Sequence, residues 1–454
     1  MFVASGVRVA VIGGGIGGAS TAFHLRQLLP NVSIDVFERE ARVGGRIDHV
    51  DVDGAVETGA SMWIGQNRLL HEFAVRAGLP VVRKAGSGLL GVWNGHDMVF
   101  RSSVFMPVTM IRALWRYGLA SRDVQQLVDE TVARFSRIYD IPPWNSVVDL
   151  FSDELALKNL TQVTLETFLA ARGISQTYID ELASAAVRVN YGQSQAQISA
   201  FAGLVTLAAM SSDAFQLAGG NVQIVDAMLR RADASVRLQT PAYRIEKLSP
   251  LSAATSPSTV WQRVVKLFDK AAAPHEAAAP TARFLVNGEP FDYVVLATPV
   301  ELSSKLQFVG VRRPKERAFQ STHTLIVSGV PAATRELETV LTTESAEPGA
   351  DFTSFALQKR FANGTAVFKV FSRRPLDERV LQSAFADGGF TVHWRKAWRA
   401  YTVLSPTAPS EWSDAVLDDD GALYTSALES CVSTMETAAL AGRNAARWIA
   451  AKEM

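Results

Sequence analysis

The first forty residues alternate between apolar runs and turn-forming residues in a way that predicts a β-α-β unit. Residues 7–12 form an apolar run rich in valine, which predicts a strand, and residues 15–28 follow a glycine loop with a helical pattern. Pro30 and Asn31 mark a turn, and residues 32–37 predict a second strand. Such a unit is the building block of a parallel sheet covered by helices.

Helical and strand-forming blocks alternate along the rest of the chain. Residues 100–185 predict mostly helices, interrupted at Pro142 and Pro143, and a further helix start is predicted at 218–221. Strands are then predicted at 236–238, 243–247, 260–268, 283–286 and 293–297, and a final helix at about 435–451. This order indicates two domains that interleave along the chain.

The composition is that of a globular protein with a large core. Of the 454 residues, 48% are hydrophobic and 20% are charged. Basic and acidic residues number 45 each, and this neutral balance argues against nucleic acid as the main partner. The single cysteine, Cys431, excludes an internal disulfide, and the seven histidines show no metal-ligand spacing. We therefore expect no metal site.

The sequence also limits the expected location. Only six residues precede the first predicted strand, which leaves no room for a secretory signal. No apolar run reaches the ~18 residues that a bilayer span requires, and the longest candidate, 198–210, is interrupted by polar residues. We therefore expect a cytoplasmic protein. Residues 101–122, which mix arginine, tryptophan and aliphatic residues, predict at most a peripheral contact with membranes.

The strongest chemical signal is a dinucleotide fingerprint. Gly13 permits the tight turn after the strand, Gly15 lets the backbone approach a pyrophosphate, and Gly18 lets the helix pack closely on the strand. The helix N-terminus faces the phosphates with unpaired amides. Glu38 follows at the end of the second predicted strand, where its carboxylate can accept hydrogen bonds from a ribose diol.

The next stretch resembles the second signature of the amine-oxidase-like flavoproteins and indicates FAD as the cofactor. That signature spans residues 38–46, and residues 57–61 resemble the segment beside the isoalloxazine ring. Residues 238–242 and 293–299 resemble the strands that meet the adenine and close the site. Glu429 and the helix opening at Met435 resemble the last flavin motif. Besides the four residues of the fingerprint, the implied FAD-binding residues are Arg39, Gly44, Gly45, Arg46, Gly59, Ala60, Ser61, Ala242, Ala297, Thr298, Glu429 and Met435.

Within these flavoproteins the chain resembles the prenylcysteine oxidase family, also called prenylcysteine or farnesylcysteine lyases. The heptapeptide at 188–194 is the most specific match, and the other segments follow in the same order at 198–203, 218–221, 368–372, 398–401 and 435–436. The chain differs from the animal members, which are lysosomal, in lacking a signal sequence and in its single cysteine.

The resemblance implies an α/β fold class, with a Rossmann-like FAD-binding domain of the glutathione-reductase and amine-oxidase type interleaved with a mixed α+β substrate domain. We assign residues 1–95, 216–305, which include a β-meander, and 416–454 to the FAD domain. Residues 96–215, mainly helical, and 306–415 form the substrate domain.

The implied reaction is the oxidative cleavage of S-farnesyl- or S-geranylgeranyl-cysteine with O2 and water, which yields cysteine, a prenyl aldehyde and hydrogen peroxide. The implied process is the degradation of prenylated proteins. The chemistry resides in the cofactor, so the protein must supply an apolar slot and polar groups for the amino acid. Candidate slot walls are Phe105, Met106, Leu114 and Trp115, and candidate substrate contacts are Asn190, Tyr191, Gln193 and His323.

Some assignments stay open at the level of sequence. No catalytic base is identified, although His323 is a candidate for activating water and Lys369 for contacting the flavin through water, as lysines do in amine oxidases. One alternative is another flavin oxidase of the amine-oxidase type. Another alternative, of a different class, is a non-catalytic prenyl-protein carrier resembling the GDP-dissociation inhibitors. Arg46 and the helix that begins at Met435 argue against this alternative. The sequence leaves the prenyl preference and the oligomeric state open.

Overall fold

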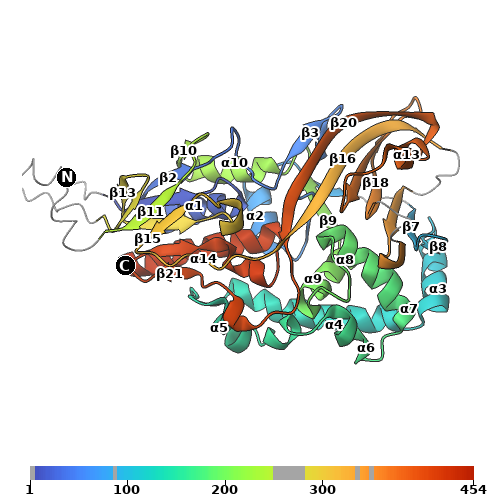
Figure 1. Cartoon of the computed structure of the whole chain (residues 1–454), viewed down its shortest axis with the longest axis horizontal. Coiled ribbons are helices and arrows are strands. Elements are labelled where there is room, and N and C mark those ends of the chain that lie inside the picture. The colour runs from blue at the N-terminus through green and yellow to red at the C-terminus, as the bar shows by residue number, and fades with distance from the viewer. Residues whose placement is uncertain (1–5, 85–88, 249–281, 333–337, 347–351) are drawn as a thin grey trace, which may run out of the picture.

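One half of the molecule is built on a six-stranded sheet assembled from segments far apart in sequence (Figure 1). The computed structural model describes residues 6–84, 89–248, 282–332, 338–346 and 352–454. The first five strands of the sheet run parallel, and the last is antiparallel to its neighbour. In spatial order the strands are β10 (Ser235–Arg237), β2 (Ser33–Phe37), β1 (Arg8–Ile12), β14 (Tyr293–Leu296), β22 (Ala422–Tyr424) and β21 (Val416–Asp418).

Three helices pack together beside this sheet: α1 (Ile16–Leu28), α10 (Val222–Arg231) and α14 (Met435–Glu453) (Figure 1). The strands β1 and β14 are buried on both faces, as expected for the interior of a parallel sheet. A Cβ at Gly442 would lie 2.3 Å from the Gly17 carbonyl oxygen, so α1 and α14 approach each other more closely than larger residues would allow. The C-terminal helix is thereby fixed against the glycine loop that begins α1.

A second, seven-stranded sheet forms the other half of the molecule (Figure 1). Its long strands β16 and β20 arch over the junction between the halves. In spatial order its strands are β20 (Phe385–Thr402), β16 (Phe319–Pro331), β19 (Ala366–Ser372), β18 (Ser354–Arg360), β17 (Thr339–Thr342), β7 (Leu90–Trp93) and β8 (Met98–Arg101).

Most of the remaining helices lie beneath this second sheet (Figure 1), and small sheets complete the fold. The helices are α2 (Arg68–Arg76), α3 (Met106–Tyr117), α4 (Ala120–Phe135), α5 (Val147–Asp149), α6 (Leu165–Ala170), α7 (Gln176–Tyr178), α8 (Ser184–Tyr191), α9 (Ala200–Ser211) and α13 (Glu378–Gln382). Of these, α2 packs on α14, and α13 packs on β20. The small sheets contain β3 (His49–Asp51) and β4 (Ala55–Glu57); β5 (Trp63–Ile64), β9 (Ala214–Leu217) and β6 (Val81–Lys84); and β13 (Glu289–Phe291), β12 (Phe284–Val286), β11 (Arg244–Lys247) and β15 (Gln307–Val309).

The predicted β-α-β unit is confirmed to within one residue at each boundary, as are four of the later strands and the start of the terminal helix. The strand predicted at 260–268 lies outside the described residues. In the part of the chain that the structure describes, no helix has both the length and the hydrophobicity that a membrane span requires.

Candidate functional site

The glycine loop between β1 and α1 combines two different reasons for glycine. A Cβ at Gly18 would lie 2.0 Å from the Gly13 carbonyl oxygen, and Gly13 has a φ of +113°, so the loop needs glycine at both positions to close. A Cβ at Gly15 would meet only the Gly44 carbonyl oxygen, at 3.9 Å, so packing does not require glycine there. Glycine at this position therefore leaves space beside the helix N-terminus.

That helix N-terminus is suited to an anion. Gly15 is the N-cap residue of α1 and offers no side-chain cap, and the first turn contains no acidic residue. The first amides of the helix are thus not used by a capping side chain, and the positive end of the helix dipole faces the space beside Gly15. These features fit the pyrophosphate of a dinucleotide.

Glu38 lies at the end of β2, buried and anchored beside the glycine loop. One carboxylate oxygen accepts the amide of Gly14 at 2.8 Å, and the other accepts the amide of Glu40 at 2.8 Å. Each oxygen keeps a second lone pair for a ribose hydroxyl. Arg39 points outward, where its guanidinium donates to the Leu302 carbonyl oxygen at 2.8 Å.

The later strand segments predicted to contact FAD lie against this same loop. The amide of Ala297 donates to the Ile12 carbonyl oxygen at 2.8 Å, and a Cβ at Gly13 would lie 3.2 Å from the side chain of Thr298. The segment leading to Ala242 is tied to Glu38, because the amide of Thr240 donates to the Glu38 carbonyl oxygen at 2.8 Å. These segments therefore converge on the ends of β1 and β2.

The second glycine pair brings Arg46 to the C-terminal segment. Gly44 pairs with the glycine loop, its amide donating to the Gly14 carbonyl oxygen at 2.9 Å. Arg46 then forms a bidentate ion pair with Glu429, with N–O distances of 2.7 and 2.9 Å. Burial would raise the pKa of Glu429, but the Arg46 guanidinium holds it below its ordinary value. Both groups are therefore charged, and the pair fixes the approach to α14.

The segment 59–61 lies directly on Arg46. A Cβ at Gly59 would lie 2.2 Å from the Arg46 carbonyl oxygen, so glycine is required there, and the amide of Ala60 donates to the same oxygen at 3.1 Å. The hydroxyl of Ser61 donates to the Gly59 carbonyl oxygen at 2.8 Å and accepts a hydrogen bond from the ammonium of Lys369. The predicted flavin segment thus contacts the second sheet.

Lys369 interacts electrostatically with two other ionisable side chains, the buried Glu57 and the half-buried Lys84. Burial lowers the pKa of Lys369 to about 7 and raises that of Glu57 to about 7, and burial also lowers the pKa of Lys84. One oxygen of Glu57 accepts the amide of Asn221 at 2.6 Å, whereas its other oxygen is buried without a partner. Strongly perturbed, buried ionisable groups are concentrated at functional sites.

The sheet face that carries Lys369 holds further unpaired polar atoms. Lys369 on β19 is opposite Ile326 on β16, and Trp398 on β20 is opposite Thr322 on β16. Thr322, Thr324 and Ile326 are alternate residues of β16, so Lys369, Thr324 and Trp398 share one face of the sheet. The hydroxyl of Thr324 and the indole nitrogen of Trp398 are buried without a partner among the described residues. Because buried polar groups are nearly always paired, this face is suited to a bound ligand or water.

The heptapeptide at 188–194 reaches this region from α8. The Tyr191 hydroxyl donates to the Ser433 carbonyl oxygen at 3.0 Å, and its ring packs edge-on against Tyr401. Gln193 accepts the amide of Leu404 at 2.9 Å, and its amide nitrogen is buried without a partner. Asn190 instead donates back to its own helix, to the Ala186 carbonyl oxygen at 3.0 Å.

The start of α14 has a reciprocal capping box. The Thr434 hydroxyl accepts the amide of Thr437, and the Thr437 side chain accepts the amide of Thr434. The amides of Met435 and Glu436 are not part of this capping box, so they can face an electron-rich group. Ser433 donates to Glu429 at 3.1 Å, which links this helix start to the Arg46 pair.

Two sets of candidate residues are not brought to this group. His323 is adjacent to Thr324 on β16 and opposite Ser372, so its side chain lies on the other face of the sheet from Lys369. The predicted slot walls are wrong, because Phe105, Met106, Leu114 and Trp115 are exposed by 70%, 65%, 56% and 87%. They point outward from α3 and cannot enclose a substrate.

Sequence reasoning missed the shifted pKa values of Glu57 and Lys84. It also missed the unpaired polar atoms of Thr324 and Trp398. Glu57 had one usable signal, its place as the first residue of the segment 57–61, whereas Lys84 had none. In the described part of the chain no cluster of potential metal ligands occurs. An open cleft of about 840 Å3 lies between α10, β10 and residues 42–49, but the Lys369 group does not line it.

Comparison with known proteins gives a consistent result. The family described as prenylcysteine lyase matches residues 100–453, and an NAD(P)-binding Rossmann-like domain matches residues 11–76. Prenylcysteine oxidase 1 of Pongo abelii is 30% identical, with 97% of this chain and 88% of the relative covered. Farnesylcysteine lyase of Arabidopsis thaliana is 29% identical, with 98% and 88% covered.

Solved structures agree on the fold. Cyclohexylamine oxidase from Brevibacterium oxydans superimposes with a TM-score of 0.63 at 16% identity, with 99% of each chain covered. A putrescine oxidase bound to putrescine gives a TM-score of 0.63 at 14% identity, with 98% of this chain and 99% of that chain covered. The predicted α/β class, with a Rossmann-like domain in an amine-oxidase type of fold, is confirmed.

Proposed function

The chain belongs to the prenylcysteine lyase family, and we propose that it is an FAD-dependent oxidoreductase that cleaves the thioether of S-prenylcysteine. The overall reaction consumes one S-prenylcysteine, one O2 and one water, and it produces cysteine, a prenyl aldehyde and hydrogen peroxide. The carbon–sulfur bond breaks, the prenyl carbon is oxidised to the aldehyde, and O2 is reduced. When bound, FAD would supply the hydride acceptor for the carbon beside sulfur.

The observation that carries this proposal is the convergence of two features at one place. The glycine loop at 13–18 contacts Gly44, and Arg46 contacts the segment 59–61. Ser61 in that segment contacts Lys369 on a buried sheet face that has unpaired polar atoms. A redox cofactor bound at the glycine loop would therefore contact a buried, polar surface. The relatives named prenylcysteine oxidase and farnesylcysteine lyase support the substrate class.

Each part of the chain has a proposed role in this site. The dinucleotide is held by the glycine loop, Glu38 and the start of α1, and Arg46 with Glu429 orients the segment beside the ring. The remaining proposed cofactor contacts are Arg39, Gly44, Gly45, Gly59, Ala60, Ser61, Ala242, Ala297, Thr298 and Met435. The amides that begin α14 stabilise negative charge.

The proposed substrate contacts differ in the support that they receive. Tyr191 contacts Ser433, directly before α14, and Gln193 contacts Leu404, after the end of β20. The amide nitrogen of Gln193, which is buried without a partner in the described part of the chain, can bind an amino-acid carboxylate. Geometry lends no support to His323 or Asn190. Lys369, whose pKa burial brings to about 7, can hold or release a proton near neutral pH beside Ser61.

The proposed domain division follows from the same arrangement. Residues 1–95, 216–305 and 416–454 would bind the cofactor, and 96–215 with 306–415 would bind the substrate. A lipophilic substrate of this class partitions into bilayers, so a peripheral membrane contact belongs to the same proposal. The comparisons give no support to the alternative of a non-catalytic carrier.

The test is an anaerobic reduction of the purified, FAD-loaded protein. Farnesylcysteine should bleach the flavin absorbance, and admitting air should restore it with equal amounts of farnesal, cysteine and peroxide. Putrescine should leave the absorbance unchanged. Deuterium at the prenyl carbon beside sulfur should slow the bleaching. A fully loaded protein that neither farnesylcysteine nor geranylgeranylcysteine bleaches would refute the proposed function.

A further inference from the structure

The outward side of α3 is an apolar surface that the described chain leaves uncovered. Within the helix only Tyr117 is buried, whereas the neighbouring helix α4 buries four residues along one side. The outer face of α3 is defined here as the exposed apolar residues of the helix and its flanks: Val104, Phe105, Met106, Met110, Ile111, Leu114, Trp115 and Leu119, which are 56–87% exposed. Contiguous apolar patches of this kind mark interaction surfaces.

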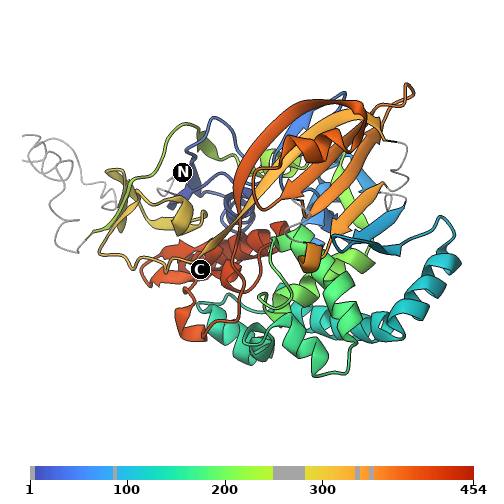
Figure 2. The same ribbon diagram turned by 45° about the vertical axis from the view of Figure 1, so that its right-hand side comes forward.

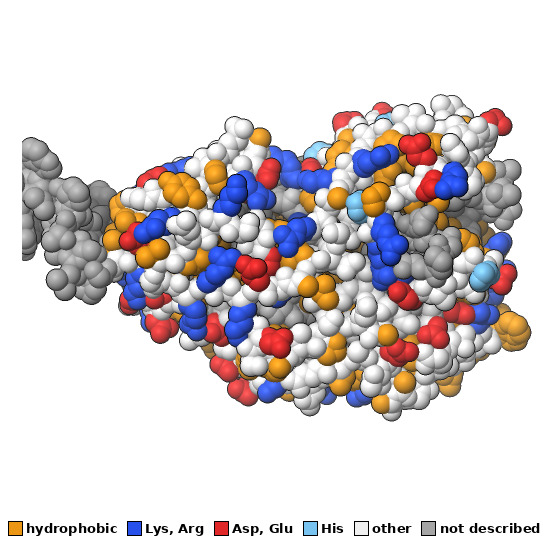
Figure 3. All heavy atoms as spheres, viewed as in Figure 1, with side chains coloured by type: hydrophobic (Ala, Val, Ile, Leu, Met, Phe, Trp, Pro, Cys, Tyr) orange, Lys and Arg blue, Asp and Glu red, His pale blue; other side chains and the backbone are white. Residues whose placement is uncertain are grey.

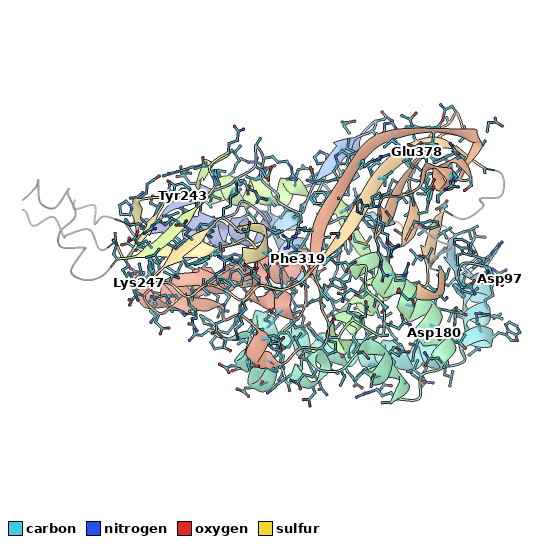
Figure 4. All side chains as sticks on the ribbon, in the orientation of Figure 1. Asp97, Asp180, Tyr243, Lys247, Phe319 and Glu378 are labelled. Carbon is cyan, nitrogen blue, oxygen red and sulfur yellow. The ribbon has the colours of Figure 1, made fainter. Side chains whose placement is uncertain are left out.

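This face lies at one end of the molecule. Figure 2 shows α3 at the outer edge of the helical layer, and Figure 3 shows a hydrophobic patch at that edge, next to charged side chains. Asp97, just before β8, marks the same end in Figure 4, whereas Tyr243 and Lys247 of the parallel-sheet half lie at the opposite end. A flat surface can therefore approach α3 without obstruction from the other half of the molecule.

The segment around α3 contains more basic than acidic residues. Residues 97–123 contain four arginines and two acidic residues, the exposed Asp97 and Asp123 at the two ends, in a chain whose net charge is zero. Arg116 is fixed on the inner side by a bidentate ion pair with Glu181, at 2.5 and 2.6 Å. Arg101, Arg112 and Arg122 are exposed. The outer face is thus apolar, and its border holds more exposed arginines than exposed carboxylates.

We propose that the outer face of α3 docks on a membrane surface that contains anionic lipid. Apolar side chains with tryptophan enter the boundary between headgroups and acyl chains, and arginines bind the lipid phosphates and carboxylates. Docking there would let the protein take a prenylated substrate from the bilayer, and this second part rests on the proposed function.

The charge pattern also distinguishes a membrane from a second copy of the chain. A symmetric dimer through this face would bring Arg101, Arg112 and Arg122 of both copies into one interface, with fewer carboxylates in the segment 97–123 than arginines to pair with them. An anionic surface is complementary to the same pattern. The membrane is therefore the occupant that the observations favour.

Vesicle flotation of the full-length holoenzyme tests the proposal. The protein should float with vesicles of phosphatidylcholine and phosphatidylserine and float weakly with phosphatidylcholine alone. The double variant Ile111→Ser/Trp115→Ser should lower the partition coefficient by at least about tenfold. Arg112→Gln should weaken binding only to the anionic vesicles. The matched control is Val75→Ser on α2, which removes a side chain that is 57% exposed and should bind like wild type.

The possible results separate docking from catalysis. The double variant should oxidise dissolved farnesylcysteine at the wild-type rate but act more slowly on farnesylcysteine loaded into vesicles. Wild-type protein that floats but fails to oxidise farnesylcysteine would refute the proposed function and leave docking intact. Wild-type protein that stays at the bottom with both vesicle types, or a double variant that floats equally well, would overturn the docking proposal. A dimer in light scattering that the double variant dissociates, without vesicle binding, would overturn it in favour of a contact between copies.

Discussion

Lys369→Met should make the protein more stable at neutral pH while it lowers activity. Lys369 is 5% exposed, and its ammonium donates to Ser61 beside the proposed flavin segment. Methionine has a similar length and volume, so the packing around β19 should be kept. Ser61 retains its own hydrogen bond to the Gly59 carbonyl oxygen. The substitution therefore isolates the effect of a buried charge.

The magnitude follows from the pKa of the lysine. Burial lowers this pKa from 10.5 to about 7. At about 1.4 kcal/mol for each factor of ten, the protonated lysine destabilises the fold by at most about 5 kcal/mol. Glu57 attracts the ammonium and also has its own pKa raised by burial, so losing its partner offsets part of the gain. We expect a net increase of about 2–4 kcal/mol in the free energy of unfolding at pH 7.

The sign of the pH dependence is fixed by the same shift. Between pH 7 and 10.5 the unfolded lysine binds a proton that the folded lysine does not, so this group lowers stability increasingly as the pH falls. The cost is absent above pH 10.5 and fully present below pH 7. The stability difference between Lys369→Met and wild type should therefore grow as the pH is lowered from 10 to 7.

Urea unfolding of the holoenzyme at several pH values, with equal FAD content in both proteins, measures this difference. Lys305→Met, which replaces an exposed lysine, is the control and should show no such trend. The same Lys369→Met protein should lose at least about tenfold in turnover, because a residue that costs stability is expected to contribute to function. A stability difference that is independent of pH, or a variant less stable at every pH, would refute the assignment of a buried, perturbed lysine.

Three further predictions concern the cofactor site. Gly18→Ala should unfold at a lower temperature than wild type, because its Cβ would lie 2.0 Å from the Gly13 carbonyl oxygen. Gly15→Ala should fold normally and lose FAD affinity by about tenfold or more. Wild-type FAD affinity in Gly15→Ala would place the pyrophosphate elsewhere. Glu38→Ala should weaken FAD binding by one to two decades, since each charge-assisted hydrogen bond contributes about 1.5–3 kcal/mol, and fluorescence titration should show it; an unchanged affinity would mean that Glu38 serves only the backbone amides. Acid precipitation should release the yellow colour into the supernatant, because Cys431, the sole thiol, is buried; colour in the pellet would indicate a covalent link.

The sequence by itself determined the parts of the site that depend on neighbours in the chain. The glycine loop, the helix that it opens and Glu38 at the next strand end all fall within one β-α-β unit, whose apolar spacing and turns are local properties. Glycine at positions 13 and 18 follows from sterics inside that unit. Such features can be read before any tertiary contact is known, and the structure places them as expected.

Only the tertiary structure decided which distant residues meet and which side of a helix is covered. Arg46 pairs with Glu429 across 383 positions, and Lys369 reaches Ser61 across 308, and no periodicity in the sequence encodes such contacts. The apolar pattern of α3 predicted a buried wall, yet its residues face solvent. A hydrophobic pattern specifies that a face avoids water, whereas the packing of the remaining chain decides whether protein or some other partner covers it.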